Sequence, residues 1–159
     1  MDSNFIGKNY KGIIDIGADY EIGNLNIINL GVSLNSGILE SNSKQASGFK
    51  EFKVTTYVIQ PRLFGELDLE SISRFHPSVG LGYTFMVFDA YVVDNGFNIS
   101  DEIDTQSGFN LNLGFSYDVT DKIFVQTQYD FIKLIEKDVP NIKFNTNVNI
   151  VKIGAGYRL

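Results

Sequence analysis

The chain contains no cysteine and no tryptophan, three prolines and a single histidine, His76, among its 159 residues. Without cysteine there is no disulfide and no thiolate metal site, and one histidine excludes a multi-histidine metal centre. We therefore expect no metal or other cofactor. Basic residues are not in excess either, since 13 lysines and arginines stand against 19 acidic residues, a formal net charge of −6. A general nucleic-acid binder carries a basic stripe, so nucleic acid is not an expected partner.

Long hydrophobic runs are also missing. No stretch approaches the roughly 20 apolar residues of a membrane-spanning helix. The opening residues MDSNFIGKNYKG lack the apolar region of a secretory signal peptide, so we expect the numbered chain to be a mature or trimmed form. These absences do not establish a soluble protein, because membrane strands alternate in polarity and never collect their apolar residues in one run.

Glycine and aromatic residues are plentiful, and apolar residues recur at every second position. The stretch GFNLNLGFSYD places its large apolar residues on one face and Gly, Asn and Ser on the other. No stretch of useful length has the helical period, so the sequence predicts a single all-β domain over 1–159. About seven strands are expected, at 11–22, 25–36, 52–64, 75–89, 107–119, 122–134 and 146–159.

The predicted connections alternate in length. Tight turns are expected at 21–24 and 119–122, and an intermediate link at 65–74. Longer links are expected at 37–51, 90–106 and 135–145. Short turns on one side and long loops on the other are typical of antiparallel outer-membrane barrels. Pro61 falls inside a predicted strand and cannot donate a ladder hydrogen bond, so we expect a bulge or a shifted strand boundary there.

The size of the side chains indicates which face is buried. The apolar faces carry bulky Phe, Tyr, Leu and Ile, which do not fit inside a barrel of seven or eight strands. The polar faces are rich in Gly, Ser, Asn and Thr, which suit a narrow interior. This inverted arrangement predicts an antiparallel up-and-down transmembrane barrel; the alternative is a soluble ligand-binding barrel of the lipocalin type.

The same alternation places charged residues inside the predicted barrel. Lone buried charges are costly, so we expect the inward charges to form a network of salt bridges and hydrogen bonds with nearby Gln60, Asn112, Gln126 and Gln128. The predicted network consists of Asp15, Asp19, Arg62, Asp130, Lys152 and Arg158. We expect it to plug the lumen, and the alternative is a narrow porin-like channel.

A short repeat occurs three times, as IGADYEI, LGFSYDV and IGAGYRL. Each copy lies at the end of a predicted strand that runs towards the tight turns. We therefore expect Tyr20, Tyr117 and Tyr157 to face outward at a similar depth, as an aromatic belt at one membrane interface.

The stretches HPSVGLGYTF, FNLNLGFSYDVTDKIFVQTQYDF and VKIGAGYRL resemble the small eight-stranded barrels of the Gram-negative outer membrane. These include the OmpA-like, OmpX-like and opacity-type barrels, and the outer membrane protein beta-barrel domain common in Bacteroidetes. The resemblance implies a location in the outer membrane, with lipid, lipopolysaccharide and the outer-membrane insertion machinery as partners. It also implies that the last strand is an insertion signal, made of Val151, Ile153, Ala155, Tyr157 and Leu159.

Two departures from the family are visible. The family usually ends in phenylalanine or tryptophan, whereas this chain ends in Leu159. A family barrel has eight strands, whereas the alternation predicts seven and places the missing strand before residue 11. We expect either further sequence upstream or a stub formed by residues 3–8.

Three other groups of residues are candidate sites. His76 and Ser78 form a His-x-Ser pair, but no acid is clearly placed to orient the histidine, so we expect an ordinary residue at a strand start. The acids of 89–104 lack the spacing of a calcium loop and predict a solvated external loop. Lys44, Lys50 and Lys53 would suit lipopolysaccharide phosphates, although a soluble loop explains them as well.

These features together predict a protein that is not an enzyme. We expect a structural role, a role in adhesion or interaction through external loops, or an accessory place in an outer-membrane complex. A protein partner would bind those loops, and its identity does not follow from the residues.

Overall fold

The computed structural model describes residues 10–44, 51–69, 73–94, 97–135 and 146–158, and within them the chain is built from strands. The strands are β1 (Tyr10–Leu25), β2 (Ile28–Lys44), β3 (Glu51–Leu67), β4 (Phe75–Asp94), β5 (Phe97–Asp118), β6 (Ile123–Leu134) and β7 (Asn147–Tyr157). No helix in these ranges is long and apolar enough to cross a membrane. The all-β prediction is confirmed.

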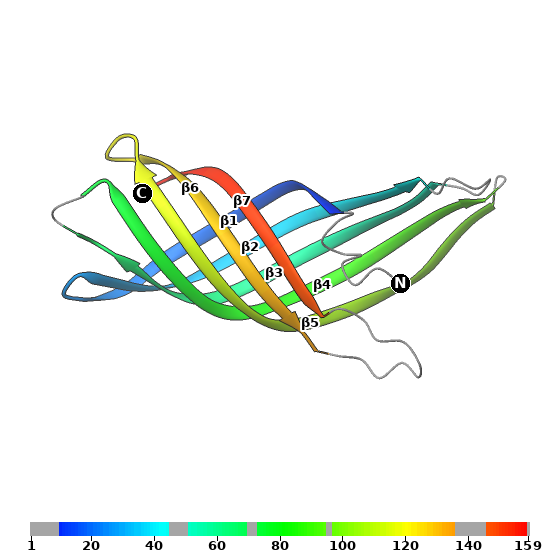
Figure 1. The fold of residues 1–159 in the computed structure, drawn as a ribbon, viewed down its shortest axis with the longest axis horizontal. Helices are drawn as coiled ribbons and strands as arrows, with labels where there is room; N and C mark the ends of the chain where they lie inside the picture. The colour runs from blue at the N-terminus through cyan, green and yellow to red at the C-terminus, as the bar shows by residue number, and fades with distance from the viewer. Residues whose placement is uncertain (1–9, 45–50, 70–72, 95–96, 136–145, 159) are drawn as a thin grey trace.

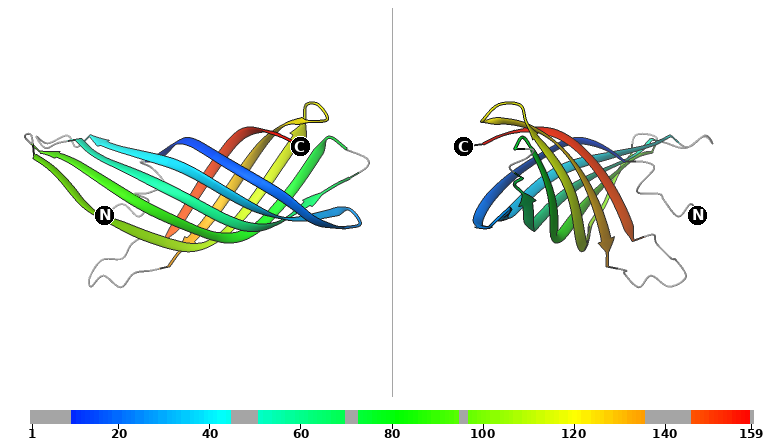
Figure 2. Two further views of the ribbon diagram at one scale, coloured as in Figure 1. Left: turned by 180° about the vertical axis from the view of Figure 1, so that it is seen from behind. Right: turned by 60° about the vertical axis from the view of Figure 1, so that its left-hand side comes forward.

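The strands form one meander in which each strand pairs antiparallel with the next, in the order β1 to β7. The sheet is long and strongly curled, so that β7 returns towards β1 (Figure 1). A view turned by 60° shows the strands wrapping round a common axis (Figure 2). The fold is therefore a near barrel of seven up-and-down strands, with a seam between β1 and β7.

Over the middle of the sheet, the inward side chains are polar or small and the outward side chains are apolar. Along β5, Phe109, Leu111, Leu113, Phe115 and Tyr117 are exposed, whereas the residues between them are buried from Gly108 to Ser116. Because side chains alternate across a strand, one choice of register fixes the environment of the whole element. The structure thus has the predicted inverted arrangement, in which bulky apolar side chains face outward and small or polar side chains face inward.

The two tight turns lie at one end of the sheet. Thr120 closes the turn between β5 and β6, since its Oγ1 accepts hydrogen bonds from the amides of Lys122 (3.3 Å) and Ile123 (3.0 Å). That turn was predicted at 119–122. The other prediction, a turn at 21–24, is wrong because β1 continues to Leu25. The chain reverses instead at Asn26, whose φ of 57° is a left-handed conformation that asparagine tolerates.

The strands are longer at the opposite end than the sequence predicts. β2 continues to Lys44, β4 to Asp94, and β5 begins at Phe97. The predicted loops at 37–51 and 90–106 are therefore wrong over most of their length. Hydrogen bonding to a neighbouring strand maintains the extended conformation there, even where the side chains lose their strict alternation. The predicted link at 135–145 lies almost wholly outside the described residues.

Pro61 is accommodated without a bulge, so that expectation is also wrong. Pairing of β3 with β4 stops after Ile59 with Phe85 and resumes at Arg62 with Gly82, in an unchanged register. On the other side, Pro61 stays in register with Leu34 of β2. The ladder is thus interrupted at the proline, which lacks an amide hydrogen, while the strand keeps its course.

Candidate functional site in the lumen

The middle of the lumen holds a network of charged and amide side chains centred on Asp130 of β6. Asp130 is 0% exposed, and its Oδ2 lies 3.2 Å from both Arg62 Nη2 and Lys152 Nζ. Its other oxygen, Oδ1, accepts a hydrogen bond of 2.6 Å from Asn112 Nδ2. Four strands meet at this carboxylate, because each residue occupies an inward position of its own strand.

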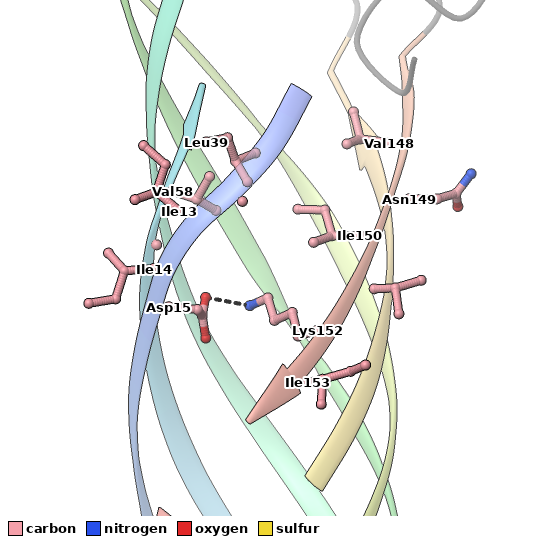
Figure 3. A pocket seen from close by; sticks show the side chains of 13 residues that line it. Ile13, Ile14, Asp15, Leu39, Val58, Val148, Asn149, Ile150, Lys152 and Ile153 are labelled. Atoms are coloured by element: carbon pink, nitrogen blue, oxygen red, sulfur yellow. Dashed lines mark ion pairs between the residues drawn. The ribbon is translucent and has the colours of Figure 1, made fainter. Parts of the chain in front are cut away.

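The two cations have further partners. Gln60 Oε1 accepts hydrogen bonds from Arg62 Nη2 (2.6 Å) and Lys152 Nζ (2.8 Å), and Gln60 Nε2 donates to Thr84 Oγ1 (3.1 Å). Lys152 also pairs with Asp15 of β1 at 2.8 Å, across the seam (Figure 3). Two acids and two bases therefore balance one another, as a buried charge cluster requires.

A glycine makes room for this network. A Cβ on Gly82 of β4 would lie 2.6 Å from Arg62 Cγ and closer still to the carbonyl oxygen of Pro61. Any larger residue at this position would collide with the backbone of β3 and with the Arg62 side chain. The enrichment of small residues on the inward face thus has a specific function here, which is to let long charged side chains fold across the lumen.

Towards the longer ends of the strands, the lumen becomes apolar. Val58, Met86, Ile132, Leu134 and Val148 form a buried cluster, and none of them is more than 3% exposed. They occupy the inward positions next to the polar network on β3, β4, β6 and β7. This apolar layer was not predicted, although Val58 was assigned to the inward face.

Towards the tight turns, the lumen holds a second ionic cluster. His76 Nε2 lies 2.9 Å from Asp118 Oδ2, and its Nδ1 lies 3.9 Å from Glu66 Oε1. Arg158 joins both acids, with Nη2 at 3.2 Å from Asp118 Oδ1 and Nη1 at 3.8 Å from Glu66 Oε1. Its guanidinium also lies 5.0 Å from the ring centroid of Phe124.

The six residues predicted to form one lumenal network are thus divided by the structure. Asp15, Arg62, Asp130 and Lys152 lie together, whereas Arg158 belongs to the lower cluster. Asp19 lies on the inward row of β1, in register with Ser33, and forms no hydrogen bond or ion pair with any residue in the described ranges. Parity identified the face of each residue, but it carries no information on height along the barrel.

The lower cluster also corrects the interpretation of His76. An acid does orient this histidine, since Asp118 contacts Nε2, and the side chain is buried in an ionic cluster. Sequence reasoning missed Glu66 because it ended the strand of Glu66 too early, and it placed Asp118 on the polar face of its strand without including it in the predicted network. Strand parity was the available signal, because Glu66 shares the parity of Arg62 and Asp118 that of Asn112.

His76 has no nucleophile in hydrogen-bonding contact. Its Nδ1 is buried without a hydrogen-bond partner among the described residues, and so is the Oγ of Ser116, its neighbour in register on β5. The described residues also contain no group of three or more acid, histidine or cysteine side chains able to hold a metal ion. The arrangement around His76 is that of an ion-paired, packed histidine.

On the outer face, the predicted belt and insertion residues are exposed. Tyr117 and Tyr157 stand at or next to the ends of their strands, whereas Tyr20 lies five residues before the end of β1. Val151, Ile153, Ala155 and Tyr157 share the outward face of β7, while Leu159 lies outside the described residues. Their roles as belt and insertion signal remain predictions.

Most of the remaining candidate positions have side chains outside the described part of the chain. Asp89 is exposed near the end of β4, but the side chains of the other acids in 89–104 lie outside the described part of the chain. The same holds for Lys44, Lys50 and Lys53. The expectations for calcium and lipopolysaccharide binding by these loops therefore stay predictions from the sequence.

A curled meander with a polar, ion-paired interior and a continuous bulky apolar exterior defines a transmembrane β-barrel of the outer-membrane type. The sequence matches the family described as "Outer membrane protein beta-barrel domain" over residues 2–158. The chain belongs to this family, and its location is the outer membrane. A comparison with curated proteins gave no match.

Proposed function

We propose that this protein is a non-enzymatic barrel whose lumen is closed by its own side chains, with a structural or loop-presenting role in the outer membrane. The observation that carries the proposal is the filling of the middle of the lumen. Gln60, Thr84 and Asp130 are each 0% exposed, although they line what would be a pore. Next to them, the buried apolar layer of Val58, Met86, Ile132, Leu134 and Val148 fills a further part of the lumen.

The absence of enzymatic activity is part of the same proposal. Support comes from His76, whose ring is ion-paired to Asp118 and has no nucleophile in hydrogen-bonding contact among the described residues. Under this proposal the partners are lipid and lipopolysaccharide around the apolar face, and the insertion machinery at the last strand. Protein partners would bind the external loops, or a larger outer-membrane complex would take the barrel as an accessory subunit.

Planar-bilayer conductance tests whether the lumen is closed. We expect no steady openings from the wild-type protein, and openings from the Arg62→Ala/Asp130→Ala double variant, which removes both charges together. The matched control is Leu63→Ala/Phe131→Ala, which changes the outward neighbours on the same two strands and should stay closed. Steady wild-type openings that depend on Arg62 and Asp130 would instead support a narrow channel.

A further inference from the structure

The outward face of β6 is apolar along most of its length and ends in a lysine. Its exposed positions are, in order, Ile123, Val125, Thr127, Tyr129, Phe131 and Lys133. Among the strand residues whose side chains the structure describes, Lys133 is the only lysine or arginine on the outward face. A cation that faces hydrocarbon is costly, so the position of Lys133 relative to the membrane decides what its ammonium contacts.

Strand geometry places Lys133 at the edge of the apolar band that lies opposite the tight turns. β6 begins at Ile123, directly after the tight turn. From Ile123 to Lys133 the strand rises about 34 Å, which is about 24–28 Å across the membrane for a tilt of 35–45°. The apolar band of such a barrel is about 25 Å tall, and its short turns are periplasmic. The Lys133 ammonium therefore lies among the headgroups of the outer leaflet.

Aromatic side chains flank Lys133 on the neighbouring strands. Lys133 is in register with Phe109 of β5, and Phe109 is in register with Tyr83 of β4. The ring centroids of Tyr83 and Phe109 are 5.5 Å apart, and the Tyr83 hydroxyl shares a hydrogen bond of 3.1 Å with Ser107. Aromatic side chains with a polar tip gather where lipid meets water. Their presence beside Lys133 supports the placement that the strand length gives.

Hydrogen-bond donors lie next to this ammonium. Lys133 Nζ donates a hydrogen bond of 2.7 Å to Thr146 Oγ1, which leaves the threonine hydroxyl hydrogen free to donate. Asn149 points outward from β7 (Figure 3), and its Oδ1 accepts a hydrogen bond of 2.9 Å from the Tyr129 hydroxyl. Its Nδ2 has no hydrogen bond, and Lys133 Nζ no carboxylate within 4 Å, among the described residues. An ammonium, a hydroxyl and an amide without an anionic acceptor suit a phosphate group.

We propose that Lys133, Thr146 and Asn149 bind a phosphate group of lipopolysaccharide in the outer leaflet. The level of the site selects this ligand, because the phosphates of a lipid headgroup are held at the edge of the apolar band, whereas a free anion stays in water. The end of the barrel selects the lipid, because the edge opposite the periplasmic turns meets the outer leaflet. The proposal rests on the lipid partner proposed above and adds the residues that contact it.

The test uses the complete 159-residue chain in uncharged maltoside micelles, with bisphosphorylated lipid A, the membrane anchor of lipopolysaccharide, as the probe. Native mass spectrometry measures the fraction of protein that carries one lipid A as the lipid is titrated. We expect Lys133→Gln to weaken binding about fivefold, the usual contribution of one basic residue near an anionic lipid surface. Lys133→Arg keeps the charge and should bind within about twofold of the wild type. Asn149→Leu removes one neutral donor and should weaken binding about threefold.

Lys122→Gln is the matched control. Lys122 is an exposed lysine at the tight-turn end, with its ammonium 5.8 Å from the ring centroid of Tyr157, so its loss should leave lipid A binding unchanged. Heat-modifiable gel migration shows that each variant is folded. A second comparison needs only the wild-type protein: dephosphorylated lipid A should bind about fivefold more weakly than lipid A. Inorganic phosphate at millimolar concentration should not displace lipid A.

Four results would overturn the proposal. The first is equal lipid A binding by the wild type and a folded Lys133→Gln variant. The second is equal binding of lipid A and dephosphorylated lipid A, which would mean that the phosphate is not recognised. The third is equally tight binding of phosphatidylglycerol, and the fourth is displacement of lipid A by inorganic phosphate. Conductance is measured in bilayers without lipid A, so any of these results leaves the proposal of a closed lumen intact.

Discussion

The most informative perturbation of this barrel is the replacement of Asp130 by alanine. Its carboxylate is the only one within 4 Å of the Arg62 guanidinium among the described residues, and the Arg62 side chain is 2% exposed. Lys152 is less dependent on it, because Asp15 lies 2.8 Å from the same ammonium group. The substitution therefore removes the ion-pair partner of the buried Arg62 and one of the two ion-pair partners of Lys152.

The size of the effect follows from this geometry. Removing one partner of a buried ion pair costs about 3–5 kcal/mol, because the remaining charge is desolvated without compensation. Most of this should come from Arg62, and the loss of the hydrogen bond from Asn112 Nδ2 adds to it. With a urea m value of about 2 kcal/mol/M, the unfolding midpoint should fall by roughly 1.5–2.5 M.

Urea unfolding in lipid vesicles measures the midpoint, by gel migration and by the fluorescence of the eight tyrosines, since tryptophan is absent. Asp121→Ala, an exposed acid in the turn between β5 and β6, is the control and should change stability by less than about 0.5 kcal/mol. The Arg62→Met/Asp130→Leu variant should recover most of the loss, because apolar residues of similar volume replace both charges. A midpoint shift below about 0.5 M for Asp130→Ala, or no recovery in the double variant, would refute the reasoning.

Two further predictions concern the inward and outward faces. Gly82→Ala should destabilise the barrel by about 1–3 kcal/mol in the same assay, since the new Cβ lies 2.6 Å from Arg62 Cγ. Gly154→Ala, whose Cβ meets nothing closer than 3.9 Å, is the matched control, and equal losses would contradict the packing argument. Leu81→Lys on the lipid face should cost about 2–4 kcal/mol in vesicles, whereas Val119→Lys in the turn should cost no more than about 1 kcal/mol. An equal cost at the two sites would mean that Leu81 does not contact hydrocarbon.

Alternation alone predicted the face of nearly every described residue that matters to the lumen. Gln60, Arg62, Asn112, Asp130 and Lys152 were all assigned inward, and all five contribute to the central network. This succeeds because the side-chain period of a strand is two residues, whatever the tertiary fold around it.

The sequence did not predict the height at which each inward residue lies along the barrel axis. Arg158 and Asp130 have the same predicted role, yet they lie in separate clusters, because the stagger between successive strands sets which inward residues meet. The strand ends were also misjudged, as at Leu25 and Lys44, because pairing with a neighbour extends a strand beyond its alternating core. The extension of β3 to Leu67 likewise brings Glu66 into the lower cluster.

The sequence by itself determined that this protein is an inverted barrel, because a narrow interior accepts small polar residues and the bulky apolar residues must then face lipid. Only the tertiary structure decided which charges neutralise one another, where the apolar layer lies, and in which register each strand pairs with the next. The physical reason is that polarity is carried by each residue along the chain, whereas register, stagger and closure depend on pairing between strands that are distant in sequence.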